Sequence, residues 1–266
     1  MTDLSAAERV LKELGVTKPQ EIDLEAIAWH LGVKIKVSPL DGCEARIVGH
    51  GDRAIIRVRP SNYRRRQRFS IAHELGHWKH HRGRMLICRT EDIGNRRPET
   101  PKAERVADGY AADLLMPRYI FDPIAWQHDR LTVSVVRELA DLFHTSLTAT
   151  AIRVVETRHR SALLVCHGRE GRNWFRRSPE VPERWFPQKH LDPESFAFDL
   201  LFGNDDEQPR PRLIGADAWF DRRHAQDHEL FEQSVRTAAD EILTVLWLRD
   251  DKMLEDWDSR PSRRFP

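Results

Sequence analysis

The sequence predicts an α+β fold, mainly helical with a small sheet in its first part and α+β again in a smaller second part. Before residue 158, long stretches have helical periodicity, and short β-type runs interrupt them between residues 33 and 59. Beyond residue 158, strand-like runs, prolines and tryptophans become frequent, which places a domain boundary there. The predicted parts are a first domain over 1–158, an α+β accessory domain over 159–258 and a disordered tail over 259–266.

The composition is that of a globular, highly charged chain, with 40% hydrophobic and 32% charged residues. Its 43 basic and 42 acidic side chains nearly cancel, so the overall charge does not argue for nucleic-acid binding. No stretch approaches the roughly 18 consecutive apolar residues of a membrane span. The first residues do not read as a secretory signal, and Cys43, Cys88 and Cys166 form no CxxC pair. We therefore expect a cytoplasmic protein without disulfides.

Two helices are predicted near the start, over residues 5–14 and 23–31, because apolar residues recur at helical spacing and a glycine closes each stretch. A β-type run follows at 33–37. Two further β-type runs flank turn residues and predict a hairpin across 44–59.

A long helix is predicted over 64–82. Residues 83–100 contain glycine, asparagine and proline without a clear period, and we expect a loop there. Pro101 begins another helix, which stops at Pro117. Two more helices are expected, over 132–143 and 146–157.

In the second part, four runs resemble strands, whereas the segment between the last two has no assignable pattern. These predicted strands are 161–168, 173–178, 213–220 and 242–248. The aromatic residues of this part are expected mainly in the core, with a small-ligand sensor pocket as the alternative.

An HExxH motif on the long predicted helix is formed by His73, Glu74 and His77. Residues four apart lie on one face of a helix, so both imidazoles can reach one metal ion. Glu74 is rotated by about 100° from His73, which lets it hold a water beside the ion. Zn²⁺ with three protein ligands lowers the pKa of that water toward about 7, and a carboxylate can then take its proton. A polar surface helix rich in histidine is the alternative.

A catalytic zinc site needs a third protein ligand, and the next predicted helix offers one. The extended pattern HExxHxxGxxH is excluded, because His80 replaces its glycine and Gly83 replaces its histidine. Glu104 and Asp108 share a helix face that is otherwise small and apolar, where an unpaired carboxylate would be costly. Glu104 as a ligand and Asp108 as acceptor of a ligand histidine's far N–H would explain both. An exposed polar stripe is the alternative.

RQRFSIAHELGHWKHH followed by ERVADGYAADLLMP resembles the ImmA/IrrE family of zinc metallopeptidases, and the resemblance covers roughly residues 5–157. It implies a zincin-like metallopeptidase fold for the first domain, with Glu74 as general base. The zinc ligands that it implies are His73, His77 and Glu104.

The sequence departs from this family pattern at two positions. Tyr110 stands where the family usually has phenylalanine, and Asp108 stands where asparagine is common. We interpret both as variation around the site that leaves the ligands and the base unchanged.

The resemblance also implies a biological role. Proteins of this family are similar to cytoplasmic bacterial proteases that cleave a helix-turn-helix repressor, often encoded nearby. Cleavage relieves repression of stress-response or mobile-element genes. The expected partner is therefore one protein substrate, and the sequence does not indicate an oligomeric state.

His80 and Tyr110 are candidates for contact with the substrate or its oxyanion, but His80 and His81 are expected mainly on the solvent side of a helix end, where they suit the helix dipole.

Residues 131–157 have the outline of a helix-turn-helix. The second of these helices carries a single arginine, Arg153, among apolar and hydroxyl side chains, so we expect core packing and assign no nucleic-acid-binding residue.

Two functions fit these features. The first is a zinc endopeptidase with one Zn²⁺ per chain, with another divalent metal such as Mn²⁺ as the alternative. The second is a non-cleaving, metal-stabilised regulatory module that binds a repressor or DNA. We favour the enzyme, because a purely structural zinc site does not require Glu74 and usually has a fourth protein ligand, commonly cysteine.

Overall fold

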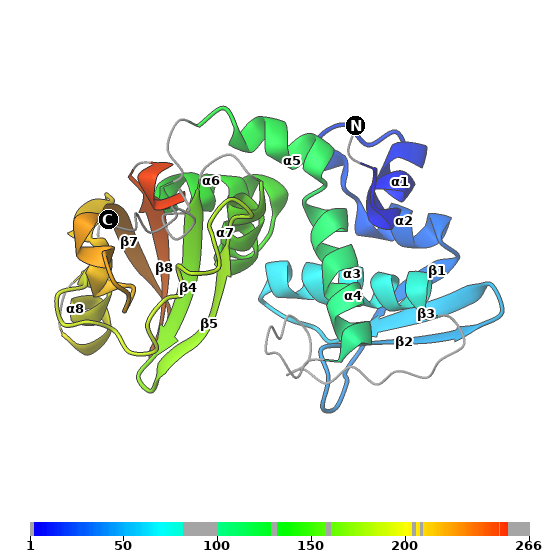
Figure 1. Ribbon diagram of the computed structural model, residues 1–266. Coiled ribbons are helices and arrows are strands. Elements are labelled where there is room, and N and C mark those ends of the chain that lie inside the picture. Colours follow the sequence, from blue (N-terminus) through cyan, green and yellow to red (C-terminus); the bar gives the residue numbers. More distant parts are fainter. Residues whose placement is uncertain are drawn as a thin grey trace. The chain divides into compact units, whose positions relative to one another are not determined.

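The computed structural model describes residues 3–81, 101–128, 132–157, 161–203, 206–207, 210–249 and 251–254. The described chain mixes helices with two sheets, which confirms the predicted fold class (Figure 1). It divides into two compact units, Met1–Asp129 with Val136–Arg153, and Arg130–Val135 with Val154–Pro266. The loop predicted at 83–100 and the tail predicted at 259–266 lie outside the described residues, and the boundary near residue 158 stays a prediction.

The first unit contains the helices expected from periodicity and one that was not expected. The unexpected helix is α5 (Arg118–Ala125), which begins directly after Pro117. The others are α1 (Ala6–Glu13), α2 (Leu24–His30), α3 (Arg64–His80), α4 (Lys102–Leu115), α6 (Val133–Phe143) and α7 (Leu147–Glu156), the last two shared with the second unit.

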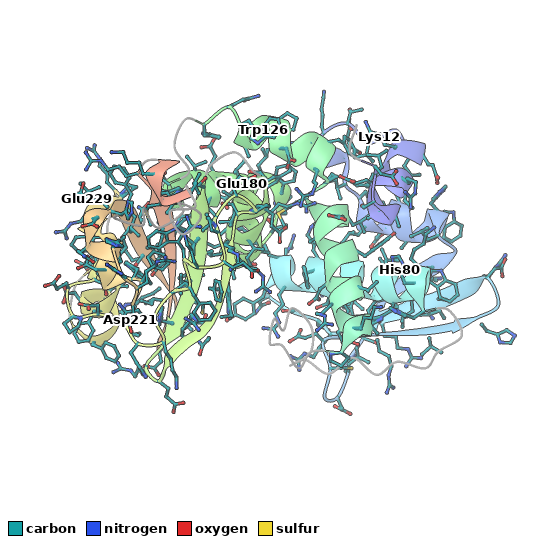
Figure 2. All side chains as sticks on the ribbon, in the orientation of Figure 1. Lys12, His80, Trp126, Glu180, Asp221 and Glu229 are labelled. Carbon is teal, nitrogen blue, oxygen red and sulfur yellow. The ribbon has the colours of Figure 1, made fainter. Side chains whose placement is uncertain are left out.

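Helices α1 and α5 are tied together by the side chain of Glu8. Its carboxylate accepts the Ser5 N–H at 2.9 Å, closing a capping box at the start of α1. The same carboxylate accepts the Arg118 N–H, the first of α5, at 2.7 Å. Lys12 of α1, labelled in Figure 2, lies 3.8 Å from the centre of the Tyr119 ring. Glu8 therefore serves the N-termini of two helices.

A three-stranded sheet of order β1-β3-β2 lies against α3 in the first unit. The predicted hairpin is confirmed, since β2 (Ala45–His50) pairs antiparallel with β3 (Arg53–Val58). Strand β1 (Val33–Val37) runs parallel to β3. Gly49 allows close packing on α3, because a Cβ there would lie 2.2 Å from the Trp78 ring.

Helix α4 packs closely on α3 at Gly76. A Cβ added to Gly76 would lie 2.9 Å from Ala107 Cα and 3.1 Å from Tyr110 Cβ. Glycine at this position therefore lets the two helix backbones come close together. It thereby brings α4, the helix that carries Glu104, close to the part of α3 that carries the two histidines of HExxH.

The second unit is built on a five-stranded antiparallel sheet of order β5-β4-β8-β7-β6. Strand β7 falls in the segment that had no sequence assignment. The predicted strand 213–220 is wrong beyond residue 215, because Ala216–Ala218 form a 3-10 helix. The strands are β4 (Ala162–Gly168), β5 (Gly171–Arg177), β6 (Arg212–Gly215), β7 (Glu229–Ala238) and β8 (Glu241–Leu248).

Helix α8 (Phe196–Phe202) lies against β7 and β8, and a buried carboxylate holds its N-terminus. Glu232 on β7 is fully buried and accepts the Ala197 N–H at 2.6 Å and the Trp219 indole N–H at 2.9 Å. The core cluster of the second unit is apolar and aromatic, and it includes Trp185, Trp219 and Phe220.

Among the residues described, no helix is long and apolar enough to cross a membrane.

Candidate metal centre

Helix α3 holds the HExxH residues in the interior of the first unit. Every side chain from Ser70 to Trp78 is buried, with His73 and Glu74 at 0% exposure and His77 at 2%. Most surface helices of globular proteins have one apolar stripe and one polar face. The alternative of a polar surface helix is therefore wrong for this segment.

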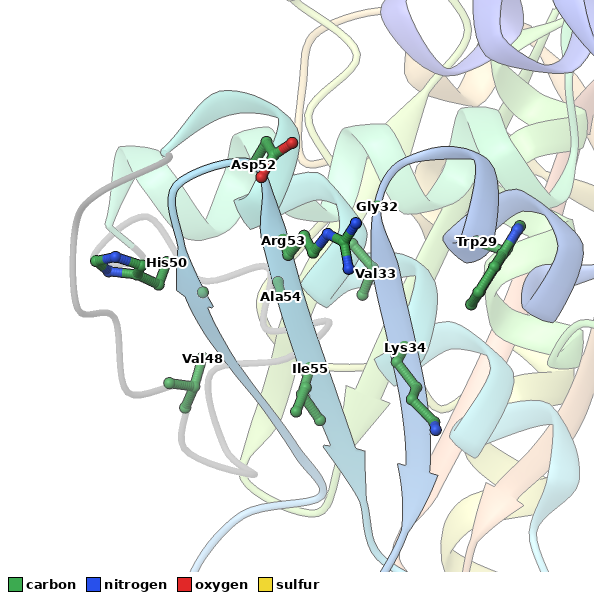
Figure 3. A pocket seen from close by; sticks show the side chains of 11 residues that line it. Trp29, Gly32, Val33, Lys34, Val48, His50, Asp52, Arg53, Ala54 and Ile55 are labelled. Atoms are coloured by element: carbon green, nitrogen blue, oxygen red, sulfur yellow. The ribbon is translucent and has the colours of Figure 1, made fainter.

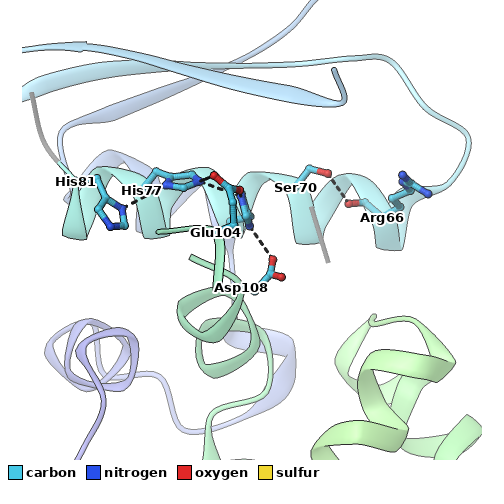
Figure 4. Close-up of polar contacts among 7 residues, drawn as sticks. Arg66, Ser70, His77, His81, Glu104 and Asp108 are labelled. Carbon is cyan, nitrogen blue, oxygen red and sulfur yellow. Dashed lines mark hydrogen bonds and ion pairs between the residues drawn. The ribbon is translucent and has the colours of Figure 1, made fainter. Parts of the chain in front are cut away.

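Helix α4 brings a carboxylate to the two histidines (Figure 4). The Nε2 atoms of His73 and His77 lie 3.0 Å apart. Oε2 of Glu104 lies 3.1 Å from Nε2 of His73, and its Oε1 lies 3.4 Å from Nε2 of His77. The three residues belong to one buried cluster of suitable donor atoms, although Glu104 follows the motif by a long interval.

These three side chains fit a divalent metal ion. Four donors arranged tetrahedrally at about 2.1 Å from an ion are about 3.4 Å apart, close to the separations seen here. Two unprotonated imidazole nitrogens and a carboxylate oxygen would repel one another at such distances in a buried place unless a proton or a metal cation lies between them. Two histidines and one glutamate also match catalytic zinc sites, which keep a coordination position open for water or substrate.

Each histidine of the cluster has a partner for its second ring nitrogen. Nδ1 of His73 lies 2.9 Å from Oδ1 of Asp108, one turn along α4 from Glu104. Nδ1 of His77 lies 3.3 Å from Nδ1 of His81. A hydrogen bond donated by Nδ1–H fixes the tautomer in which the Nε2 lone pair points into the cluster.

The charges of the cluster stabilise one another. Burial lowers the pKa of His73, but hydrogen bonds with Asp108 and Glu104 and the charges of Asp108 and Glu74 outweigh it and raise the pKa to about 9. Burial raises the pKa of Glu104, but hydrogen bonds with His73 and His77 outweigh it and lower the pKa to about 2. Glu104 is therefore an anion at neutral pH, as a metal ligand must be.

Glu74 directly follows His73 in the sequence and is fully buried. Its negative charge contributes to the raised pKa of His73. A buried carboxylate of this kind needs a compensating role or partner. It is the one member of the motif that lies outside the three-donor cluster.

The remaining predicted site residues occupy different places. His80 is exposed, and its ring makes a T-shaped contact with the ring of Tyr110, with the two ring centres 5.7 Å apart. Tyr110 is buried, and within the described residues its hydroxyl has no hydrogen-bond partner; burial raises its pKa to about 12. Neither side chain belongs to the cluster of donor atoms.

His81 was expected on the solvent side, and that expectation misses its contact with His77. The residue is half-buried. Its spacing is the signal that could have identified it, because residues 73, 77 and 81 recur at intervals of four and share one face of the helix.

The arginine of the helix-turn-helix-like segment is buried. Arg153 is 3% exposed and donates to the Met116 carbonyl at 2.8 Å and to Asp113 at 2.7 Å. Its guanidinium therefore holds the C-terminal end of α4, as expected for a packing helix.

Comparisons with known proteins connect this geometry to a family. Residues 28–155 match the family model described as the IrrE N-terminal-like domain, Peptidase_M78. A solved structure described as a Mycobacterium tuberculosis transcriptional regulator is similar in fold, with a TM-score of 0.60 and 15% sequence identity over 91% of this chain and 75% of that chain. At this identity the likeness shows the fold alone. The search of curated proteins finds no match.

Proposed function

Since residues 28–155 form an IrrE N-terminal-like domain of the Peptidase_M78 family, a relationship that supports a metallopeptidase, we propose that the chain is a zinc-dependent endopeptidase. The observation that carries this proposal is that two imidazole nitrogens and one carboxylate lie 3.0–3.4 Å apart, with a second buried glutamate, Glu74, next to His73 in the sequence.

Each residue has a distinct role in the proposed reaction. His73, His77 and Glu104 hold the ion, and Asp108 and His81 orient the two imidazoles. A bound divalent ion supplies Lewis-acid polarisation of a peptide carbonyl and lowers the pKa of water. Glu74 takes a proton from the attacking water and delivers it to the amine that leaves when the peptide bond breaks.

We propose a helix-turn-helix repressor as the substrate, cleaved in the cytoplasm, so that stress-response or mobile-element genes are derepressed. The family relationship supports a single regulatory protein substrate, and the described cysteines Cys43 and Cys166 are free and buried, in keeping with a reducing compartment. A repressor encoded beside this chain is the first candidate to assay.

A metal-stabilised regulator that binds without cutting is the second candidate, supported by the similar solved structure, which is described as a transcriptional regulator. It needs the three ligands but has no use for Glu74.

The test measures metal content and repressor cleavage together. Wild type is expected to contain about one zinc per chain, His73→Ala and Glu104→Ala to lose it, and Glu74→Gln to keep it but lose cleavage. Full cleavage by Glu74→Gln would remove the proposed base. Binding of the repressor without cleavage by metal-loaded wild type would favour the second candidate.

A further inference from the structure

The outer face of the β1-β3-β2 sheet, on the side opposite α3, is unusually basic. Alternate residues of a strand point to opposite faces, and those facing α3 include the buried Ile56 and Val58. The eight outward positions hold five lysines or arginines, one histidine and two aliphatic residues, with no aspartate or glutamate. These positions are Lys34, Lys36, Arg46, Val48, His50, Arg53, Ile55 and Arg57, called the basic face below.

The cations of the basic face lie in register across the strands. Arg57 of β3 is directly opposite Lys36 on one side and Arg46 on the other. Like charges in directly opposed positions destabilise a sheet. Within the described part of the chain, neither these three nor Lys34 and Arg53 form an ion pair that would offset the repulsion.

A hollow of about 870 Å³ opens on the same face (Figure 3). Val48 and Ile55 lie side by side in its central row, with Lys34 next to Ile55. Trp29 of α2 lines it at 77% exposure, and Val48 is 65% exposed. Asp52, in the turn between β2 and β3, is its acidic member. The hollow thus combines exposed apolar side chains with cations that form no ion pair among the residues the structure describes.

We propose that the basic face binds an acidic segment of a partner polypeptide in which carboxylates alternate with apolar side chains. The positive charge of the basic face favours a negatively charged partner, because complementary charges steer association and fix specificity. The apolar row is aliphatic, whereas single-stranded nucleic acids are held by several aromatic side chains that stack on bases; among the described residues, the hollow has the indole of Trp29 and the imidazole of His50 and no phenylalanine or tyrosine. An aliphatic row flanked by cations fits leucine-like and glutamate-like side chains better than bases.

This binding would be separate from the proposed peptidase reaction. The basic face lies on the sheet surface away from α3, the helix that carries His73 and His77. Binding therefore requires neither the ion nor Glu74, and it can be measured whether or not the chain cleaves anything.

The test uses the full chain and fluorescence anisotropy of a short labelled peptide in which glutamate alternates with leucine. Arg57→Glu should weaken binding by roughly tenfold or more, and Trp29→Ala by several-fold. Arg223→Glu is the matched control, because this exposed arginine of the second unit undergoes the same charge change. It should leave binding unchanged.

A second measurement guards against loss by misfolding. Arg57→Glu relieves repulsion from Lys36 and Arg46, so the unbound chain should melt roughly 1–4 °C higher at low salt while binding is lost. No binding by wild type, or equal binding by Arg57→Glu and Arg223→Glu, would overturn the proposal. Tighter binding of oligo(dT) than of the peptide, lost in Arg57→Glu, would overturn it in favour of nucleic acid.

Discussion

The Nδ1 atom of His77 lies 3.3 Å from the Nδ1 atom of His81, the residue that caps the C-terminus of α3. One of these nitrogens must donate a proton to the other, since two bare lone pairs would repel. Donation by His77 directs its Nε2 lone pair toward Glu104. A second imidazole thus does for His77 what the Asp108 carboxylate does for His73.

Replacing His81 should weaken metal binding without removing a ligand. His81→Ala is expected to lower zinc affinity by roughly 10–100-fold, because the His77 ring loses the partner that orients it. Competition with a chromogenic chelator measures this directly. His80→Ala is the matched control, since His80 faces Tyr110 instead of the cluster. Equal losses in the two variants would refute an orienting role for His81.

Gly76→Ala should destabilise the first unit although alanine favours helices. The added Cβ would meet the Ala107 backbone at 2.9–3.0 Å, so α4 must move, at a cost of about 1–3 kcal/mol in the free energy of unfolding. Gly109→Ala on α4 is the control, because a Cβ there meets no atom within 4 Å and should stabilise by up to about 1 kcal/mol. Chemical denaturation compares the two. A Gly76→Ala protein as stable as Gly109→Ala would contradict the close contact.

Chelation should lower the melting temperature of the first unit. An ion held by residues of both α3 and α4 binds the folded chain but not the unfolded chain. At a free ion concentration of 100 times Kd, it adds about 2.7 kcal/mol to the free energy of unfolding. Its removal is expected to reduce Tm by roughly 5–10 °C in calorimetry. Glu104→Ala should show no response to the chelator. A melting curve of wild type that is unchanged by chelation would argue against a metal linking the two helices.

Acid should destabilise the second unit through His167 on β4. Burial lowers the pKa of His167 to about 4, against an ordinary value of 6.5. Between these values the unfolded chain binds the additional proton, so this contribution to stability falls as pH decreases through that window and is constant above it. The loss near pH 4 should reach about 2–3 kcal/mol.

Equilibrium unfolding at neutral pH and near pH 4 checks this expectation. His167→Gln should flatten the dependence, whereas His224→Asn, which changes an exposed histidine of the same unit whose charge does not act on His167, should leave it in place. If wild type and His167→Gln lose the same stability on acidification, the assignment to His167 fails.

Sequence reasoning identified the elements whose pattern is local. HExxH and the small apolar face of α4 follow from helical spacing, and the hairpin follows from alternation and turn residues. It missed α5 and β7, where distant partners decide the structure. Glu8 holds the first N–H of α5 across 110 positions, and the buried Glu232 of β7 is satisfied by α8 and Trp219. Periodicity cannot show such partners, because a buried carboxylate looks like a surface one in sequence.

Glu8 also bears on where the folding unit begins. It lies outside the matched segment 28–155, yet it caps α1 and accepts the first N–H of α5, which is inside that segment. A chain trimmed to the matched residues would leave the Arg118 N–H without its acceptor and Tyr119 without the Val16 carbonyl to which its hydroxyl donates at 2.7 Å. The smallest autonomous fragment is therefore longer than the recognisable motif, and shortened forms made for biochemistry should keep residues from Ser5 onward.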